Sequence, residues 1–253
     1  MQKQSFSIII IMGILTVSLG CTFSSLPINQ VTTGEIQYDS QVIELGDAEE
    51  VRVNLAMGAG ELKVDNRAED LLEANFTFNV ESWAPDMNYT VEDNKGRLSI
   101  RQPQTNDINI GGNVKYAWDL RFAPDIPLDM RIDCGAGDHN LDFSNLSVTS
   151  LNVKVGAGNV NIDLTDNSGL RDMDFDIGAG NVDIDLDGVW DQKVDVSIQG
   201  GVGRISLRLP NDVGVRVNVS KGIGNVDARG LSRQGDSYTN EAYEENGTVL
   251  DIN

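Results

Sequence analysis

The chain has 253 residues, of which 39 are acidic and 19 are basic, so its formal net charge is −20. A phosphate backbone is bound by clustered Lys and Arg side chains, which this composition lacks, so we expect no nucleic-acid partner. Hydrophobic residues make up 40% of the chain, which is enough to bury a core. The 26 glycines indicate many turns, and a single histidine argues against His-rich metal sites and His-dependent catalysis.

The first twenty residues form a targeting segment. Lys3 precedes an apolar run over residues 6–19, which is shorter than the roughly 20 residues needed to span a bilayer and suits a signal peptide. The run Ser18-Leu19-Gly20-Cys21 resembles the bacterial lipoprotein processing box, although an aliphatic residue is usual where Ser18 stands. We therefore expect residues 1–20 to be a lipoprotein signal peptide and Cys21 to be lipidated, which implies an extracytoplasmic protein anchored to a membrane of the cell envelope. The alternative is a soluble secreted protein that is cut nearby.

Composition divides the rest of the chain into four segments. Residues 21–34 are small and polar and suit a flexible tether. Residues 35–101 contain short runs that alternate between apolar and polar residues, which predicts an N-terminal β domain. Within it, residues 50–103 suit a first Gly-x-Gly unit followed by a meander. The polar stretch 102–113 has no periodicity and is the expected loop before a second β domain over residues 114–253. The strands expected in the N-terminal domain are Val51–Leu55, Glu61–Val64, Leu72–Ser82, Met87–Glu92 and Arg97–Arg101.

A Gly-x-Gly repeat dominates the second half of the chain. Its last five copies begin 21 to 23 residues apart, which indicates stacked copies of one structural unit. In each unit an alternating strand leads into the glycines and a second one leads out, as in residues 151–155 and 160–164. Because one unit cannot bury its apolar face alone, the repeat predicts an all-β, β-solenoid-like stack. The glycines of the motif are Gly58, Gly60, Gly135, Gly137, Gly156, Gly158, Gly178, Gly180, Gly201, Gly203, Gly222 and Gly224.

The apolar alternation slips by one residue at each Gly-x-Gly. Val155 and Ala157 share one face of a strand, yet the next apolar residue is Val160. A bulge or a sharp corner produces such a slip, and glycine suits it because glycine tolerates a positive φ. We therefore expect a structural corner at each Gly-x-Gly, followed by a connector such as TDNSGLRD that returns the chain to the next layer.

Two parts of the sequence resemble known extracytoplasmic domains. Residues 51–78, which include MGAGEL, resemble the N-terminal domain of the toast-rack proteins. The later segments LNVKVGAGNVNIDL and FDIGAGNVDIDL are similar to the repeats of "putative adhesin" domains and of cell-wall-active antibiotic response proteins. The resemblance implies an extracytoplasmic all-β stack and brings no catalytic motif with it. The chain lacks the helical hairpin block of the membrane-integrated response proteins, so we do not expect it to signal across a membrane alone.

The outward residues of the second strands form three columns if the units stack in register. The third column begins with Asp142, Asp163 and Asp185. Carboxylates on strands about 4.8 Å apart repel one another, and a hard cation such as calcium would reduce that repulsion. This column is therefore a candidate weak calcium site, and the alternative is a solvated face with an Asp185–Arg208 surface pair. The other two columns interleave amides and charges: Asp138, Asn159, Asn181, Arg204 and Asn225, then Asn140, Asn161, Asp183, Ser206 and Asp227.

Cys134 and His139 lie on either side of one corner. Cys134 occupies the position of Val155 in the next unit, which predicts a buried small hydrophobic residue without a redox role. His139 occupies the position of Val160, so we expect it on the inner face, hydrogen-bonded to a neighbour or a water molecule. No organic cofactor is expected, because a dinucleotide or phosphate site would need a helix after the glycines, where a strand follows.

Two classes of function fit these features. The first is a non-enzymatic envelope lipoprotein that presents a rigid β-stack for adhesion, scaffolding or sensing of surface material, with a protein or polysaccharide of the envelope as its partner. The second is an enzyme that acts on envelope polymer through paired carboxylates. Such carboxylates usually lie in a cleft beside aromatic residues, whereas Trp83, Trp118 and Trp190 stand in three separate segments. We therefore favour the first class.

Overall fold

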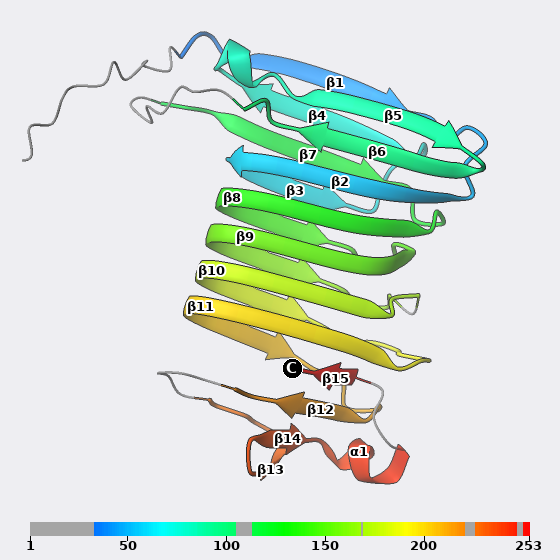
Figure 1. Ribbon diagram of the computed structural model, residues 1–253, viewed down its shortest axis with the longest axis vertical. Coiled ribbons are helices and arrows are strands. Elements are labelled where there is room, and N and C mark those ends of the chain that lie inside the picture. Colours follow the sequence, from blue (N-terminus) through cyan, green and yellow to red (C-terminus); the bar gives the residue numbers. More distant parts are fainter. Residues whose placement is uncertain (1–32, 105–112, 168, 221–225, 247–249) are drawn as a thin grey trace, which may run out of the picture.

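The structure, a computed structural model, describes residues 33–104, 113–167, 169–220, 226–246 and 250–253. Within them, 15 strands form one sheet, which Figure 1 shows as a tall stack. The described helices are the short η1 (Glu81–Trp83) and α1 (Glu241–Asn246), and neither is long and apolar enough to cross a membrane. The predicted all-β, β-solenoid-like fold is confirmed. Cys21 and the leader lie outside the described residues.

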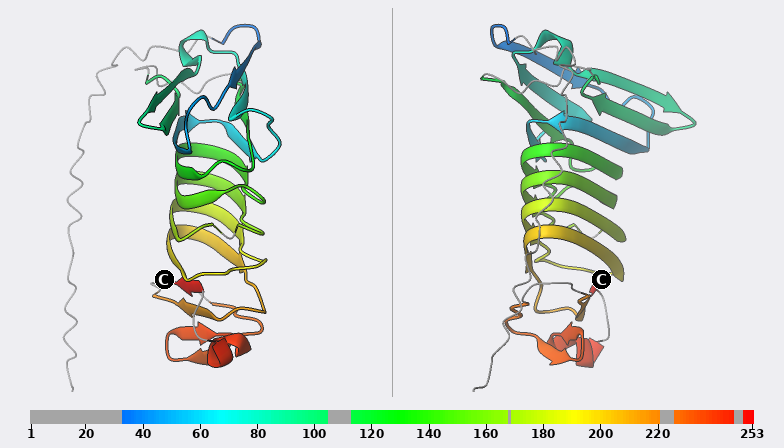
Figure 2. Two further views of the ribbon diagram at one scale, coloured as in Figure 1. Left: turned by 90° about the vertical axis from the view of Figure 1, so that its right-hand side faces the viewer. Right: turned by 60° about the vertical axis from the view of Figure 1, so that its left-hand side comes forward.

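Four long parallel strands form the middle of the stack. Each strand bends back at its Gly-x-Gly, so it has a first arm before the glycines and a second arm after them (Figures 1 and 2). We call such a pair of arms a rung. Neighbouring rungs pair in register through the corner, so the second glycines lie in one row: Gly137, Gly158, Gly180 and Gly203. The strands are β8 (Leu128–Asp142), β9 (Val148–Asp163), β10 (Asp172–Asp185) and β11 (Val194–Arg208).

The core lies between the first and second arms. In β9 the residues Leu151, Val153 and Val155 of the first arm and Val160 and Ile162 of the second arm are buried, while the residues between them are exposed or half-buried. Because successive side chains of a strand point to opposite faces, each arm turns its apolar face inward against the other arm. Full burial of one such side chain contributes about 1.5–3 kcal/mol, so the repeated aliphatic residues stabilise every rung.

Two different constraints require glycine at the corners. The second glycine has a positive φ, which is +148° at Gly158, and L side chains rarely adopt this conformation. Neighbouring rungs also approach closely, because a Cβ atom on Gly158 would lie 1.7 Å from the carbonyl oxygen of Gly137. The first glycine has only the second constraint, with 2.4 Å between a Cβ on Gly156 and the carbonyl oxygen of Gly135.

The N-terminal segment continues the same stack. The strands β2 and β3 are the two arms of a rung whose corner contains Gly58 and Gly60, and they pair with the two arms of β8. Beyond β2 the sheet adds β6 and β5, and beyond β3 it adds β7, β4 and β1. The bounds are β1 (Gln37–Ile43), β2 (Glu50–Ala59), β3 (Glu61–Asp65), β4 (Leu72–Phe78), β5 (Asp86–Glu92), β6 (Lys95–Arg101) and β7 (Tyr116–Phe122).

This arrangement differs from the meander and the domain division that the sequence suggests. Only β5 and β6 form a hairpin of consecutive strands in this segment. The segments on either side of residues 102–113 share one sheet and one hydrophobic core. The strand expected to reach Ser82 ends at Phe78 and is followed by η1.

The last repeat does not add a fifth regular rung in the described part of the chain. The C-terminal strand β15 (Leu250–Ile252) pairs with β11 on one side and with β12 (Val215–Asn218) on the other. The first arm of the last repeat is therefore one strand away from β11, which places its second arm beyond pairing distance. Accordingly, residues 226–229 form no strand, so Asp227 and Arg229 leave the predicted columns. Gly222, Gly224 and Asn225 lie outside the described residues, and the stack closes with β13 (Ser232–Gln234) and β14 (Ser237–Thr239).

Candidate functional site

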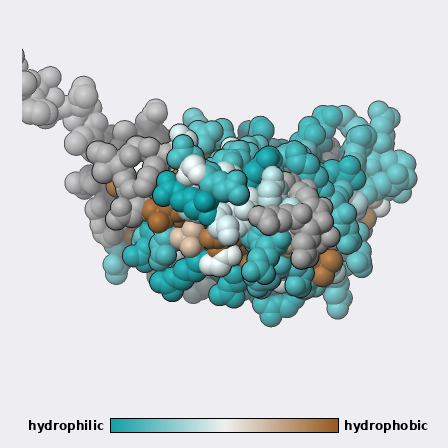
Figure 3. Space-filling model, turned by 90° about the horizontal axis from the view of Figure 1, so that it is seen from below, coloured by the Kyte–Doolittle hydropathy of each residue, from teal (hydrophilic) through white to brown (hydrophobic). Residues whose placement is uncertain are grey.

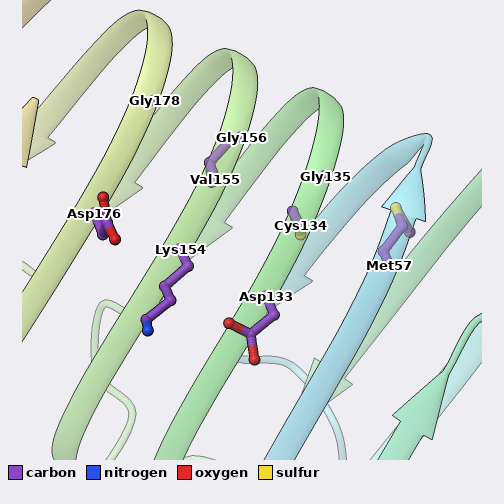
Figure 4. Close-up of a pocket in the computed structure, with 9 residues that line it drawn as sticks. All are labelled: Met57, Asp133, Cys134, Gly135, Lys154, Val155, Gly156, Asp176 and Gly178. Carbon is purple, nitrogen blue, oxygen red and sulfur yellow. The ribbon is translucent and has the colours of Figure 1, made fainter. Parts of the chain in front are cut away.

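An open depression lies on the first arms, next to the corners of β8, β9 and β10, and both exposed and buried residues line it (Figure 4). Its volume is about 460 Å³. Charged side chains form one part of its lining and bare glycine backbone another. The lining residues are Asp133, Lys154 and Asp176, then Gly135, Gly156 and Gly178, and the apolar Met57, Cys134 and Val155.

The register of the stack creates the charged row of this depression. Asp133, Lys154 and Asp176 are direct neighbours on three successive strands, so the charge alternates from negative to positive to negative. Lys154 is exposed and forms no salt bridge with a described residue, so its ammonium group is available to a partner. Sequence reasoning missed this row, although each of the three residues stands two positions before the first glycine of its repeat. The row can supply an acceptor, a donor and an acceptor at the spacing of the strands, about 4.8 Å.

The aspartates proposed as a calcium site have a role in turns. Asp142, Asp163 and Asp185 are direct neighbours at the ends of their strands. The carboxylate of each accepts a hydrogen bond from a backbone N–H two residues later, at distances of 3.0, 2.9 and 3.0 Å, which forms an Asx turn at the start of the connector. Asp185 also lies 3.5 Å from the Nε atom of Arg208. Among the described residues, no group of three or more His, Cys, Asp or Glu side chains is arranged to hold a metal ion, so the structure does not bring these carboxylates together as a cation site.

The first of the predicted columns forms a ladder of side chains on the outer face of the second arms. The Nδ2 group of Asn159 donates to the Asp138 carboxylate at 2.8 Å, and the Nδ2 group of Asn181 donates to Oδ1 of Asn159 at 3.0 Å. The amides of this ladder join three rungs by side-chain hydrogen bonds outside the core.

Cys134 and His139 are both buried on the inner faces of β8. Burial raises the pKa of the Cys134 thiol to about 12, and the neighbouring charge of Asp133 acts in the same direction, so this thiol is unreactive at neutral pH. Neither ring nitrogen of His139 has a hydrogen-bond partner among the described residues, so the expected neighbouring side chain or backbone group is not found. The reason is that its cross-strand neighbours, Leu62 and Val160, have apolar side chains. Burial lowers the pKa of His139, and the charge of Asp138 only partly opposes this, so the ring is neutral.

The three tryptophans do not meet. Trp118 is buried and packs edge-on against Phe76, with 5.8 Å between ring centroids. Trp83 packs against Tyr116 at 5.6 Å, and Trp190 donates its Nε1–H group to the carbonyl oxygen of Leu186 at 2.8 Å. None of them lines the depression, so the charged row has no aromatic surface beside it.

Comparison with protein families agrees with the arrangement of the rungs. The family model described as the N-terminal domain of toast_rack, DUF2154, matches residues 32–170 and 166–208. These matches run from before β1 to the end of β11 and include the corner between β2 and β3. The chain belongs to the toast-rack family. In this family member the matched region crosses residues 102–113, consistent with the sheet that includes strands on both sides of this segment.

Solved structures extend the comparison of this toast-rack family member. A "putative cell adhesion protein" from Clostridium sporogenes ATCC 15579 is 26% identical, with a TM-score of 0.65, over 87% of this chain and 94% of that chain. A "putative adhesin" from Bacteroides fragilis NCTC 9343 is 13% identical over 71% of this chain and 99% of that chain, with a TM-score of 0.23. A "putative adhesin" from Parabacteroides merdae ATCC 43184 is 11% identical over 70% of this chain and 96% of that chain, with a TM-score of 0.24. Among curated proteins none matches the chain.

Proposed function

We propose that the protein is a non-enzymatic lipoprotein of the cell envelope that presents a rigid β-stack for adhesion, with a surface protein or polysaccharide as its partner. The observation that carries this proposal is the depression beside the corners, where polar groups form a row along the stack on an open face. The similarity to the Clostridium sporogenes protein, described as a "putative cell adhesion protein", supports the same role.

The charged row suits an extended partner. A polymer that lies along the stack would meet Asp133, Lys154 and Asp176 at the regular spacing of the strands. The glycines beside the row have no side chains, so a partner can approach the backbone there. The rungs beneath are held by a continuous core, so little conformational freedom is lost when a partner binds.

An enzyme that uses paired carboxylates is the second candidate, and the geometry favours it less. Glycoside hydrolysis needs two carboxyl groups on either side of the scissile bond within a cleft. Asp133 and Asp176 stand on β8 and β10, which are about 10 Å apart because β9, with Lys154, lies between them. The depression is open and no tryptophan lines it, so it lacks the enclosure that a reacting sugar requires.

The adhesion proposal predicts that the lysine in the depression carries binding. Cells that display the full chain should attach to surface material several-fold less when Lys154→Gln removes the one cation of the row. Asn161→Asp is the matched control, because it changes the net charge by the same amount on the outer face of the second arm. Attachment is measured with equal amounts of displayed protein. Equal attachment of wild type and Lys154→Gln would contradict the role of the depression.

The anchoring proposal predicts that Cys21 holds the protein in the membrane fraction. Cys21→Ser removes the thiol that would be lipidated, so the variant should lose lipid labelling and leave the membrane fraction or accumulate unprocessed. Fractionation with labelling by a radioactive fatty acid measures this. A Cys21→Ser variant that is processed, retained and labelled like the wild type would show that the anchor is elsewhere.

A further inference from the structure

The outer edge of the sheet at β1 combines exposed apolar side chains with an unpaired backbone. β1 pairs with β4 on one side, and no other described strand pairs with it. Tyr38 is 77% exposed and Val42 is 58% exposed. Because side chains alternate along a strand, both project from the same face as Ser40. Edge strands with these properties readily recruit another strand.

The other free edges of the described sheet are shorter or carry more charged residues than β1. The edge strand β5 begins with Asp86 and ends with Glu92, and β13 has only three residues. The second arm of β11 carries Arg204 and Arg208. By contrast, β1 has the sequence QYDSQVI, in which Asp39 is the one charged residue, and its seven residues pair with β4 without a bulge. Charges, short length and bulges are the usual ways to block edge pairing.

We propose that β1 pairs antiparallel with β1 of a second copy of this chain, across a two-fold axis that passes through Ser40. The sequence of β1 is self-complementary in this register. Tyr38 of each copy lies opposite Val42 of the other, which forms two aromatic and β-branched pairs of a kind that stabilises sheets. On the opposite face Asp39 meets Gln41, so each carboxylate faces an amide donor rather than another carboxylate. Such an interface uses the same surface of both copies and closes at a dimer.

The shape of this end of the stack leaves room for the pairing. On the second-arm side the sheet extends three strands beyond β3, through β7 and β4 to β1. On the first-arm side it extends only two strands beyond β2, through β6 to β5. β1 is therefore the outermost strand, as Figure 1 shows at the top of the stack. When two β1 strands meet, the two β5 strands remain separated by the width of two strands, so β5 does not block the pairing.

A disulfide at the proposed axis tests the pairing in the full chain, purified in detergent. All variants carry Cys21→Ser, so the buried Cys134 is the only other thiol. Ser40→Cys should give a covalent dimer under mild oxidation, because Cβ atoms of directly opposite residues lie about 5 Å apart. Tyr38→Cys on the same edge should not, because the two copies of residue 38 would be about 13 Å apart along the strands. Asn161→Cys, exposed on the outer face of β9, is the second control.

A noncovalent measurement complements the disulfide. In sedimentation equilibrium, Val42→Lys should weaken dimerisation about tenfold, because both Tyr38–Val42 pairs are lost together. Asn161→Lys should leave it unchanged. Selective cross-linking of Ser40→Cys together with weaker dimerisation of Val42→Lys supports the proposal. A monomeric wild type, no cross-link at residue 40, or equal cross-linking at residues 38, 40 and 161 would overturn it.

Discussion

Gly158→Ala should destabilise the protein by about 4 kcal/mol, although it adds a single methyl group. The new Cβ atom would lie 1.7 Å from the carbonyl oxygen of Gly137, and that backbone is paired in register on β8. The strain of an L side chain at a φ of +148° adds to this clash. Each of the two terms costs on the order of 1–3 kcal/mol. Urea unfolding of the full chain, followed by circular dichroism, measures the change.

Two controls separate the clash from other effects of substituting a residue at a turn. Ala157 lies one residue away in the same corner, its side chain is exposed, and the equivalent residue of β11 is the exposed Val202. Ala157→Val should therefore change the free energy of unfolding by no more than about 0.5 kcal/mol. Gly230 has a φ of +74°, and no atom lies within 4 Å of the position that a Cβ would take. Gly230→Ala should therefore lower the stability only by the backbone cost of a positive φ, about 1 kcal/mol. If Gly158→Ala does not accumulate as folded protein, Gly203→Ala in β11 provides a measurable variant. Equal unfolding midpoints for Gly203→Ala and Ala157→Val would contradict the close approach of the rungs.

His139→Val should stabilise the protein by about 1–3 kcal/mol. The ring of His139 is 2% exposed, and neither nitrogen has a hydrogen-bond partner among the described residues. Burying such groups without partners costs free energy, and valine removes both without a large change in volume. Valine already occupies the neighbouring positions at Val160 and Val182, so the slot accepts it. Thermal and urea unfolding of both forms at pH 7 measure the gain, and an unchanged or lower stability of His139→Val would contradict this account.

The same substitution should change how stability depends on pH. Burial lowers the pKa of His139 in the folded state, whereas in the unfolded chain the ring has its ordinary pKa near 6.5. Below that pH the unfolded state binds a proton that the folded state does not, so the wild type loses stability as the pH falls. The stability difference between His139→Val and wild type should therefore widen from pH 7 to pH 5. A stability difference that stays constant over this range would show that His139 is protonated equally in the folded and unfolded states. Val160→His, which buries a second imidazole one rung away, should make the stability depend more strongly on pH.

The sequence by itself determined the repeated rung. Alternation with period two identified which residues of each strand face inward, and the Gly-x-Gly motif, which recurs every 21 to 23 residues, gave the register of β8 to β11. A shift by one residue would turn Val160 and its equivalents out of the core, so a chain with these patterns has one favoured alignment. The same logic placed Cys134 and His139 on the inner face and aligned the Asp138, Asn159 and Asn181 ladder.

Only the tertiary structure decided which strands are neighbours. Alternation shows which face of a strand is buried but not which strand lies beside it, because any strand with a suitable inner face can pair with any free edge. For this reason the sequence indicated a Gly-x-Gly corner between β2 and β3 but not that these two strands pair with β8. It also did not reveal that Leu250–Ile252 inserts between β11 and β12. The absence of a protein partner for His139 among the described residues was hidden for a related reason. Hydrogen bonding depends on which side chains surround a residue. The cross-strand neighbours of His139 belong to β3 and β9, which are far apart in the sequence.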